Sequence, residues 1–435
     1  MRATQAILDF ASAKQSLTAG AREASLRLLG DTLNVGAAGS RCEEALRMLP
    51  VVRQWGSGND ARILGHDERL PAPSAAWFNG FAIHCLEWDA VHEPAVVHAL
   101  SVVTAALLAS ADRLGGCDGE EFLTALAVGV DIASGIGIAA TGAMQFFRPA
   151  TAGIIGASLA VARLEKLAPE KFAGVLGLAY SQAAGTMQAH VEASIALPLQ
   201  IAVAARGAIT AVDLAKAGME GPHDALEGPF GYYKLFEPGD LRRYTKNLGQ
   251  RWLIEDVSVK PFPSGRASHG ILGVIDDALR GQEFNGANVV SAEIYAPPLI
   301  NRLVGRPYKA NMTPAYARLC LPFLVPLMLR DRIIDPRCFS KEEFSNPNLM
   351  RLGEKVVVHV DDNPDHNALA PQRLLLTMND GSVLERIISD NLGSPSAPMS
   401  EAQTASKRDL ARSLAGEITD ERIFENPLNF ATEPK

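Results

Sequence analysis

The chain has few cysteines and few aromatic residues. Its 435 residues include five cysteines, which are scattered, odd in number and without a Cys-x-x-Cys pair. This usage argues against a disulfide framework and favours a reducing compartment, so we expect a cytoplasmic protein. Aromatic residues make up 6% of a composition that is 47% hydrophobic. Aliphatic side chains must therefore fill the core, and segments rich in Ala and Leu favour packed helices over a β-sandwich.

Long runs of one charge are also missing. The formal net charge is −8, which argues against a nucleic-acid or anionic-membrane partner. The first segment carries Asp9 and no long apolar stretch, so it does not have the pattern of a signal peptide. The most apolar windows, 99–110 and 195–212, are shorter than a membrane span or interrupted by Arg206. We expect a soluble protein with no membrane partner. The sequence also lacks a P-loop and a dinucleotide-binding fingerprint.

Helical patterns dominate the first 256 residues. Ser40 is predicted to cap a helix over 41–49, and Pro50 is predicted to end it. Nothing before about residue 250 alternates with period two for long. We therefore predict one all-helical domain over residues 1–256, with helices that include 3–14, 21–35, 41–49, 74–86, 119–142, 149–164, 169–181 and 197–217.

The pattern changes after Trp252, where short β-rich segments alternate with helical ones. Asn379-Asp380-Gly381 is a hairpin turn between two of these segments. Residues 257–397 are predicted to form an α+β domain. The last segment, 398–435, is too short to bury a core alone, so we expect it to complete the helical domain. The predicted fold class is mainly α, with strands over 288–296, 355–360, 373–378 and 383–389 and helices over 268–279, 313–329 and 340–346.

The densest group of polar side chains lies between residues 84 and 98. Three of the nine histidines fall there with three acids: His84, Glu87, Asp89, His92, Glu93 and His98. The histidines are eight and six positions apart, which is not the i, i+3 or i, i+4 spacing of a helical metal site. A metal site, an acid–base site and a solvated helix junction are all open, and we favour the acid–base site.

A second group lies in the segment VKPFPSGRASHGILG, residues 259–273. Lys260 precedes two prolines that fix an extended backbone, and Arg266 and His269 stand at the start of an apolar helix. Cations beside the free N–H groups of a helix N-terminus favour a bound carboxylate. The alternative is that Arg266 and Lys260 only pair with acids such as Asp276. Arg148 and Arg306 are weaker candidates for the same role.

Several motifs in one order resemble the MmgE/PrpD family. They are Asp31-Thr32-Leu33, the stretch from Ala75 through Asn79-Gly80 to Glu87-Trp88-Asp89, the segment KPFPSGRASHGILGVIDDAL and the linker GSPSAPMS. The match covers nearly the whole chain. It implies a large helical domain with a smaller α+β lid domain, a homodimer, and an active site in the cleft between the domains. It further implies a small polycarboxylate substrate, handled by proton chemistry without a metal or organic cofactor.

The resemblance is carried over residue by residue. Where the family reads Asp-aromatic-Asp-Asp-Thr, this chain reads Glu87-Trp88-Asp89-Ala90-Val91, with His98 as the later histidine. Arg148 stands where the family often has histidine, and Leu197 where it often has lysine. Lys260, Arg266 and His269 fit the family pattern. The predicted catalytic residues are His98, Lys260, Glu87, Asp89 and His92, and the predicted substrate-binding residues are Arg148, Arg266, His269 and Arg306.

The chemistry expected from these residues is proton removal next to a carboxylate. Such a site needs cations that neutralise the developing charge and a base with a pKa near the working pH. His98 is the predicted base, with Glu87 or Asp89 orienting its ring. The cation missing at Leu197 and the cation present at Arg148 indicate a different substrate shape, with fewer carboxylates or with one apolar arm. The predicted function is a cofactor-independent lyase, either a dehydratase or a decarboxylase, acting on a citrate- or aconitate-like polycarboxylate. The alternatives are a two-base epimerase or isomerase of a carboxylate, and a family member that has kept the fold without the activity.

Overall fold

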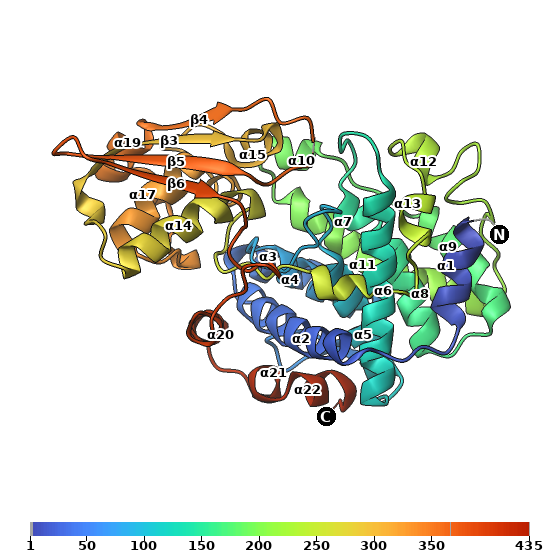
Figure 1. Ribbon diagram of the computed structural model, residues 1–435. Coiled ribbons are helices and arrows are strands. Elements are labelled where there is room, and N and C mark those ends of the chain that lie inside the picture. The colour runs from blue at the N-terminus through green and yellow to red at the C-terminus, as the bar shows by residue number, and fades with distance from the viewer. Residues whose placement is uncertain (1–2, 366, 435) are drawn as a thin grey trace.

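Two hydrophobic cores organise the protein, in a computed structural model that describes residues 3–365 and 367–434 (Figure 1). One core takes its side chains from Ile7 to Val259 and again from Ala411 to Ala431. The other takes them from Phe262 to Ile388. The fold is mainly α with a smaller α+β part, which confirms the predicted fold class.

The helical core is built around α4 (Ala72–His84), α5 (Ala99–Arg113) and α6 (Gly119–Ala139). All three are buried on nearly every side, as expected for helices that are apolar all round. The long helices α8 (Gly153–Leu164) and α11 (Ala196–Lys216) pack against them. The other helices of this part are α1 (Ala3–Ser12), α2 (Ala19–Gly39), α3 (Glu43–Arg53), α7 (Arg148–Thr151), α9 (Phe172–Tyr180), α10 (Gln188–Val191), α12 (Tyr232–Leu235) and α13 (Arg242–Thr245).

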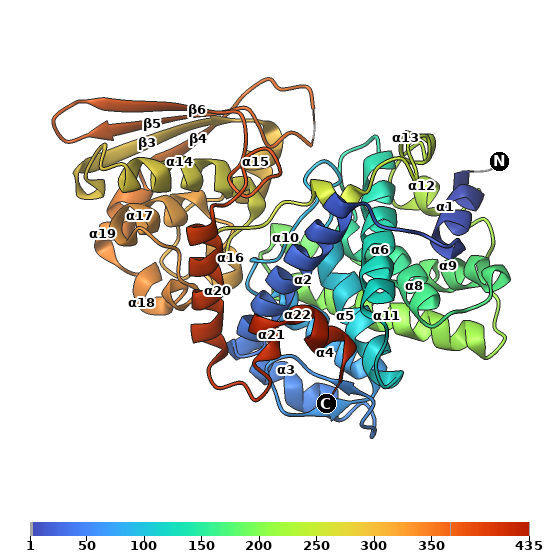
Figure 2. The ribbon, with the colours of Figure 1, turned by 60° about the horizontal axis from the view of Figure 1, so that its bottom comes forward.

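The α+β part is a four-stranded sheet with helices on one face (Figures 1 and 2). The strand order is β4 (Val356–Val360), β3 (Val289–Ala296), β5 (Gln372–Met378) and β6 (Val383–Ile388), and only β3 and β4 are parallel. Alternate residues such as Ile294, Leu374 and Leu376 are buried under α14 (His269–Arg280) and α17 (Leu321–Asp331). The shorter helices here are α15 (Pro298–Val304), α16 (Pro314–Ala317), α18 (Lys341–Phe344) and α19 (Pro347–Gly353).

The C-terminal helices return to the helical part. α20 (Glu401–Ala415), α21 (Arg422–Glu425) and α22 (Pro427–Thr432) all pack against α2, and α22 also contacts α5 (Figure 2). Their buried side chains, among them Ala411 and Phe430, belong to the helical core. The chain therefore crosses between its two parts twice, at about residues 259–262 and after 388. The domain limits of 1–256 and 257–397 stay a prediction.

Four local predictions are wrong. Pro50 lies inside α3, because proline keeps a helical φ and removes only one intrahelical hydrogen bond. Ser40 closes α2 and donates its hydroxyl to Ala37 O, so Cys42 precedes α3 in its place. The helix predicted over 313–329 is broken into α16 and α17. Two short strands, β1 (Ala61–Arg62) and β2 (Arg69–Leu70), also pair within the part predicted to be all-helical.

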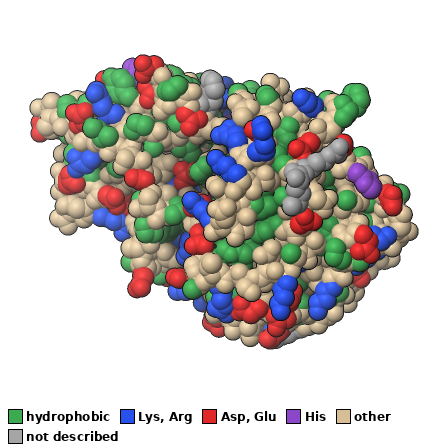
Figure 3. Space-filling view, turned by 45° about the vertical axis from the view of Figure 1, so that its right-hand side comes forward, with side chains coloured by type: hydrophobic (Ala, Val, Ile, Leu, Met, Phe, Trp, Pro, Cys, Tyr) green, Lys and Arg blue, Asp and Glu red, His purple; other side chains and the backbone are tan. Residues whose placement is uncertain are grey.

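Two helices, α6 and α11, are long and apolar enough to cross a membrane. Their most apolar windows are 94% and 61% buried within the protein. Burial of this extent is typical of core helices in a soluble protein. The windows predicted to be the most apolar, 99–110 and 195–212, do not include α6, whose mean hydropathy of 1.8 exceeds the 1.3 of α11. On the face seen in Figure 3, acidic and basic side chains are interspersed rather than gathered by sign.

Candidate active site

The site is built on the loop between α4 and α5. His84 is the last residue of α4, and His98 is the N-cap of α5. The loop folds back on itself through a bridge between His92 and Val97, which returns the chain to the end of α4. Glu87 has a φ of +53°, an uncommon backbone for a residue with a side chain. The Lys260 ammonium donates to the Glu87 carbonyl at 3.0 Å, which holds this conformation.

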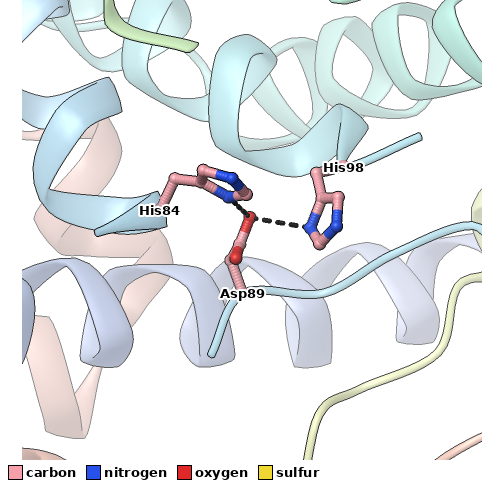
Figure 4. A group of neighbouring side chains, drawn as sticks. All are labelled: His84, Asp89 and His98. Carbon is pink, nitrogen blue, oxygen red and sulfur yellow. Dashed lines mark hydrogen bonds and ion pairs between the residues drawn. The ribbon is translucent and has the colours of Figure 1, made fainter. Parts of the chain in front are cut away.

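A single carboxylate oxygen joins the two histidines at the ends of the loop (Figure 4). Asp89 Oδ2 lies 2.9 Å from His84 Nδ1 and 3.0 Å from His98 Nδ1. It also accepts a short hydrogen bond from the Ser101 hydroxyl. The two rings meet nearly at right angles, with centroids 4.9 Å apart. Because an ionised carboxylate only accepts hydrogen bonds, each imidazole presents Nδ1–H to Asp89 and turns Nε2 away from it.

The charges around Asp89 set the protonation states. Burial would raise the pKa of Asp89, but His84 and His98 hold it well below its ordinary value. Burial and the nearby Lys260 lower the pKa of His98, although Asp89 acts against them. Burial also lowers the pKa of His84, but Asp89 and Glu87 outweigh it and the net shift is upward. The two rings that share Asp89 therefore differ in basicity: the pKa of His98 is lowered and that of His84 is raised.

Lys260 and Glu87 form a buried ion pair beside this network. Lys260 is completely buried, and its Nζ lies 3.1 Å from Glu87 Oε2 and 3.9 Å from Asp89 Oδ1. Burial opposes ionisation of Glu87, but Lys260 and the two histidines lower the pKa of Glu87 to about 2. The prolines on either side of Phe262 fix the loop that carries Lys260. Lys260 therefore keeps Glu87 charged from a buried position next to it.

Arg266 pairs with Glu93 on the α+β side of the site. Its Nε and Nη2 donate to Glu93 Oε1 at 3.0 and 2.7 Å. Its Nη1 donates to Leu392 O at 2.6 Å and lies 3.3 Å from His269 Nδ1. The other nitrogen of the buried His269 contacts Ser264. His269 therefore orients Arg266, and Arg266 is occupied by acceptors within the protein.

A cavity of about 630 Å³, counted with its opening to solvent, lies between the two parts of the chain. The polar side chains that line it are His84, Glu87, Glu93, His98, His190 and Arg266. Most of the remaining lining is apolar, and it includes Met144, Phe147, Met187, Leu197, Leu303 and Leu319.

The structure brings five of the predicted site residues together. Glu87, His98 and Arg266 line the cavity. Asp89 and Lys260 lie directly behind them and hold them through hydrogen bonds. These residues come from segments that are more than 160 positions apart in the sequence. The structure places them next to one another, at and behind the wall of one cavity. Their chemical roles stay predictions.

The other four predicted residues also lie outside the lining of the cavity. Arg148 is completely buried, donates to Glu237 Oε2 at 2.7 Å and reaches backbone carbonyls with its other nitrogens. His92 accepts from the Ala95 N–H, and burial lowers the pKa of this histidine to about 4. Arg306 lies against the Tyr316 ring and donates to His190 O. His269, the fourth, acts through Arg266.

Two histidines reach the cavity without having been predicted as site residues. His84 belongs to the polar group recognised in the sequence, and its position at the end of α4 places its ring within hydrogen-bond distance of Asp89. His190 lies on the short helix α10, where burial and the nearby Arg306 lower its pKa to about 4. Its sequence neighbours have no suggestive pattern, so its place in the cavity lining follows only from the packing of α10 against α11.

The group His84, Asp89 and His98 has the donor types that hold a transition metal. One ligand atom from each lies within 4.8 Å of the others. Imidazole and carboxylate together suit zinc and similar ions. The Nδ1 atoms of His84 and His98 are already at hydrogen-bond distance from Asp89 Oδ2. A metal ion bound by these three residues would replace the two N–H donors. A site that works without metal stays a prediction.

Comparison with known proteins gives one consistent match. Residues 7–244 match the MmgE/PrpD N-terminal domain, and residues 262–427 match the MmgE/PrpD C-terminal domain. A cis-aconitate decarboxylase of Mus musculus is 25% identical over 409 residues, covering 90% of this chain and 82% of the relative. One of Aspergillus terreus is 24% identical over 421 residues, covering 91% and 85%. One of Homo sapiens is 26% identical over 375 residues, covering 82% and 76%.

Proposed function

The chain belongs to the MmgE/PrpD family, and on that premise we propose that it is a cofactor-independent lyase acting on an acid of the citrate or aconitate type. In a dehydration, the reaction begins with removal of a proton next to a carboxylate. The observation that carries this proposal is the Asp89 carboxylate, which orients His98 at the wall of the cavity. The family relatives with decarboxylase activity support a lyase in general terms.

His98 is the base in this proposal. Its Nδ1–H donates to Asp89, so the lone pair is on Nε2. The lowered pKa of His98 keeps that lone pair free at neutral pH. When Nε2 takes the proton, the new positive charge forms beside the ionised Asp89, which stabilises it. The substrate carbon is left with the electron pair.

Two reactions give a lyase at this site. In a dehydration, the pair left by proton removal forms the double bond while the β-carbon loses its oxygen, which takes up a proton and leaves as water. In a decarboxylation of an unsaturated acid no proton is removed first: a proton adds to one carbon of the double bond, and the electron pair of the breaking C–C bond forms a new double bond as carbon dioxide leaves. His84, whose pKa is raised by Asp89 and Glu87, lines the same cavity and is the proposed proton donor in either case. The names of the relatives favour decarboxylation.

An epimerase or isomerase is the second candidate. The observation that favours it is a third imidazole, His190, on the lining of the same cavity as His84 and His98. A two-base mechanism needs one group to remove the proton and another to return it.

Reaction in heavy water separates these functions. The purified protein is incubated in deuterium oxide with cis-aconitate, citrate and shorter hydroxy acids and followed by NMR. Carbon dioxide or water released from the substrate, with a stoichiometric new product, supports the lyase. Deuterium that enters next to the carboxylate without loss of either molecule contradicts the lyase and supports the epimerase. A chain that neither consumes nor exchanges any of the acids has kept the fold without this activity.

A further inference from the structure

We propose that Cys42 and Cys85 form a modification site, at which a hydroperoxide joins the two thiols as a disulfide. The proposal goes beyond the proposed function, because it concerns neither the acid that the cavity binds nor the reaction of that acid. Cys42 is the N-cap residue of α3, and Cys85 is the residue that follows α4. The disulfide ties the start of α3 to the residue after His84.

The two sulfur atoms are already in contact. Cys42 Sγ lies 3.4 Å from Cys85 Sγ, although the two residues are 43 positions apart in the sequence. A disulfide bond is about 2 Å long, so the sulfurs have to approach each other by roughly 1.4 Å. α3 and α4 pack against each other, so no distant segment has to move for the bond to form. Among the residues that the structure describes, no other two cysteine sulfurs are in such contact.

Their surroundings give the two thiols different roles. Cys42 is half-buried, and its side chain makes no capping hydrogen bond at the start of α3, so a small oxidant can reach it. Cys85 is 3% exposed, and its Sγ lies 3.3 Å from Ala82 O and 3.5 Å from Gly39 O. Burial and the neighbouring Cys42 also raise the pKa of the Cys85 thiol well above its ordinary value. Cys42 is therefore the thiol that meets the oxidant, and Cys85 is the thiol that closes the disulfide.

The oxidation takes place in two steps. Cys42 Sγ takes one oxygen atom from hydrogen peroxide, which forms a sulfenic acid and releases one water. Cys85 Sγ then attacks the Cys42 sulfur and the S–O bond breaks. The departing hydroxide takes the proton of the Cys85 thiol and leaves as the second water. The two sulfurs together lose two electrons, and one peroxide is reduced to two waters. A small dithiol reverses the reaction by thiol–disulfide exchange.

The disulfide affects the candidate site because Cys85 holds the end of α4. His84 precedes it, and the Cys85 carbonyl accepts from Arg318 Nη1 of the α+β part at 2.8 Å. The surrounding packing is close: a Cβ on Gly39 would lie 1.9 Å from Ala82 O and 3.0 Å from Cys85 Sγ. Cys85 Sγ therefore has little room to move by side-chain rotation, and its approach to Cys42 displaces the backbone beside His84. The consequence for the reaction rate rests on the proposed function.

Peptide mapping of the full chain tests the thiol pair. The reduced protein is treated with hydrogen peroxide, alkylated with iodoacetamide and digested with trypsin, which releases Cys42 in peptide 42–47 and Cys85 in peptide 70–113. We expect these two peptides to be joined, with a mass lower by two hydrogen atoms than their sum, and to separate after treatment with dithiothreitol. Cys42 and Cys85 that stay unlinked, whether as free thiols or as sulfinic acids, would overturn the proposal.

Two serine variants assign the disulfide to this pair. Cys42→Ser removes the thiol that meets the oxidant and is expected to give no linked peptides. Serine is a preferred N-cap residue, so this variant keeps a suitable start for α3. Cys117→Ser is the matched control, because Cys117 is also half-buried but has no sulfur neighbour among the described residues. A linkage to peptide 70–113 that persists in Cys42→Ser, or that is lost in Cys117→Ser, would overturn the assignment.

The reaction rate is a separate measurement. A displacement beside His84 disturbs the positions of the reacting groups, so we expect the linked protein to convert its acid roughly tenfold more slowly. Dithiothreitol should restore the rate, and Cys42→Ser should keep its rate after peroxide treatment. Equal rates of the linked and reduced proteins would overturn the effect on the site. A reduced protein that converts none of the acids contradicts the proposed lyase, and peptide mapping still decides whether the thiol pair forms a disulfide.

Discussion

At the scale of single residues, the site depends on how one carboxylate is shared. Asp89 is completely buried and offers the same oxygen to His84, His98 and Ser101. A carboxylate in this position fixes the tautomers of both rings and supports a charge on either one. The neighbouring pairs Lys260–Glu87 and Arg266–Glu93 neutralise the rest of the wall. The result is a site with strong internal electrostatics and one histidine, His98, suited to act as the base.

His98→Gln should abolish the reaction while leaving the fold intact. Glutamine keeps much of the volume and polarity of the ring, but it has no basic nitrogen. We expect kcat to fall by roughly 10²–10⁴, the contribution of a positioned general base. The control is His223→Gln, because His223 is exposed, far from the cavity lining and expected to have no effect. Equal activity of the two variants would exclude His98 as the base.

The pH dependence of kcat/KM should follow the protonation of His98. Burial and Lys260 lower the pKa of His98 below the ordinary 6.5, so the base stays neutral and active below that pH. Activity is expected to fall only when the pH drops through this lowered value, and Glu87, with a pKa of about 2, stays ionised throughout. Asp89 is the group that raises the pKa of His98, so Asp89→Asn should move the acid limb to lower pH. A limb that moves to higher pH in this variant would contradict the assignment.

Metal removal should leave the activity unchanged. His84, Asp89 and His98 have suitable donors for a metal, but their hydrogen bonds already satisfy the Nδ1 atoms. We expect dialysis against EDTA, followed by assay with and without added zinc, to give the same rate. Loss of activity that zinc restores would show that the three residues bind a catalytic ion.

At the scale of elements, close contact between helices fixes where the site residues point. α6 and α8 touch through glycine: a Cβ on Gly156 would lie 2.3 Å from the carbonyl oxygen of Gly129. The approach packs α8 tightly against α6 and α5, the helix that begins beside His98. Only a residue without a side chain allows this distance. The packing of this core therefore contributes to the position of the loop between α4 and α5.

Gly156→Ala should destabilise the protein through the contact between α6 and α8. The new methyl group meets backbone atoms that cannot move without separating the two helices, so we expect a loss of about 1–3 kcal/mol in the free energy of unfolding. Gly174→Ala in α9 is the control, because a Cβ there meets nothing closer than 3.9 Å. Alanine at this position should be neutral or raise stability by up to about 1 kcal/mol. Urea unfolding followed by circular dichroism measures both, and equal stabilities would refute the packing argument.

At the scale of the whole molecule, the cavity exists because the chain crosses twice between its two parts. Residues 259–266 carry Lys260 and Arg266 to the loop that holds Glu87 and Glu93. Two ion pairs therefore link the loop between α4 and α5 to the segment that enters the α+β part. Arg302 and Arg318 of the α+β part add hydrogen bonds to Met144 O and Cys85 O of the helical part. These contacts fix the position of one cavity wall relative to the other.

The chain is predicted to be a homodimer, on the strength of its resemblance to the family. Sedimentation equilibrium measures this directly. We expect a mass of twice the 46.4 kDa of one chain, independent of the loading concentration over the micromolar range. A mass equal to one chain would refute the prediction.

The sequence alone determined the fold class and the main elements. Long apolar helices, period-two strands and the hairpin turn at Asn379–Gly381 are encoded in local patterns, and the strands match the structure within about two residues. The motifs around Glu87, His98, Lys260 and Arg266 were also readable, because a site that requires these residue types keeps them at fixed spacing.

Only the tertiary structure decided which of these residues face the cavity. Arg148 finds Glu237 at a separation of 89 positions, and His190 enters the lining through the packing of a four-residue helix. No local pattern encodes such contacts, because charge pairing and burial depend on which distant segments meet. The sequence thus specified the chemistry available to the protein, and the packing of distant segments determined which groups are paired with each other.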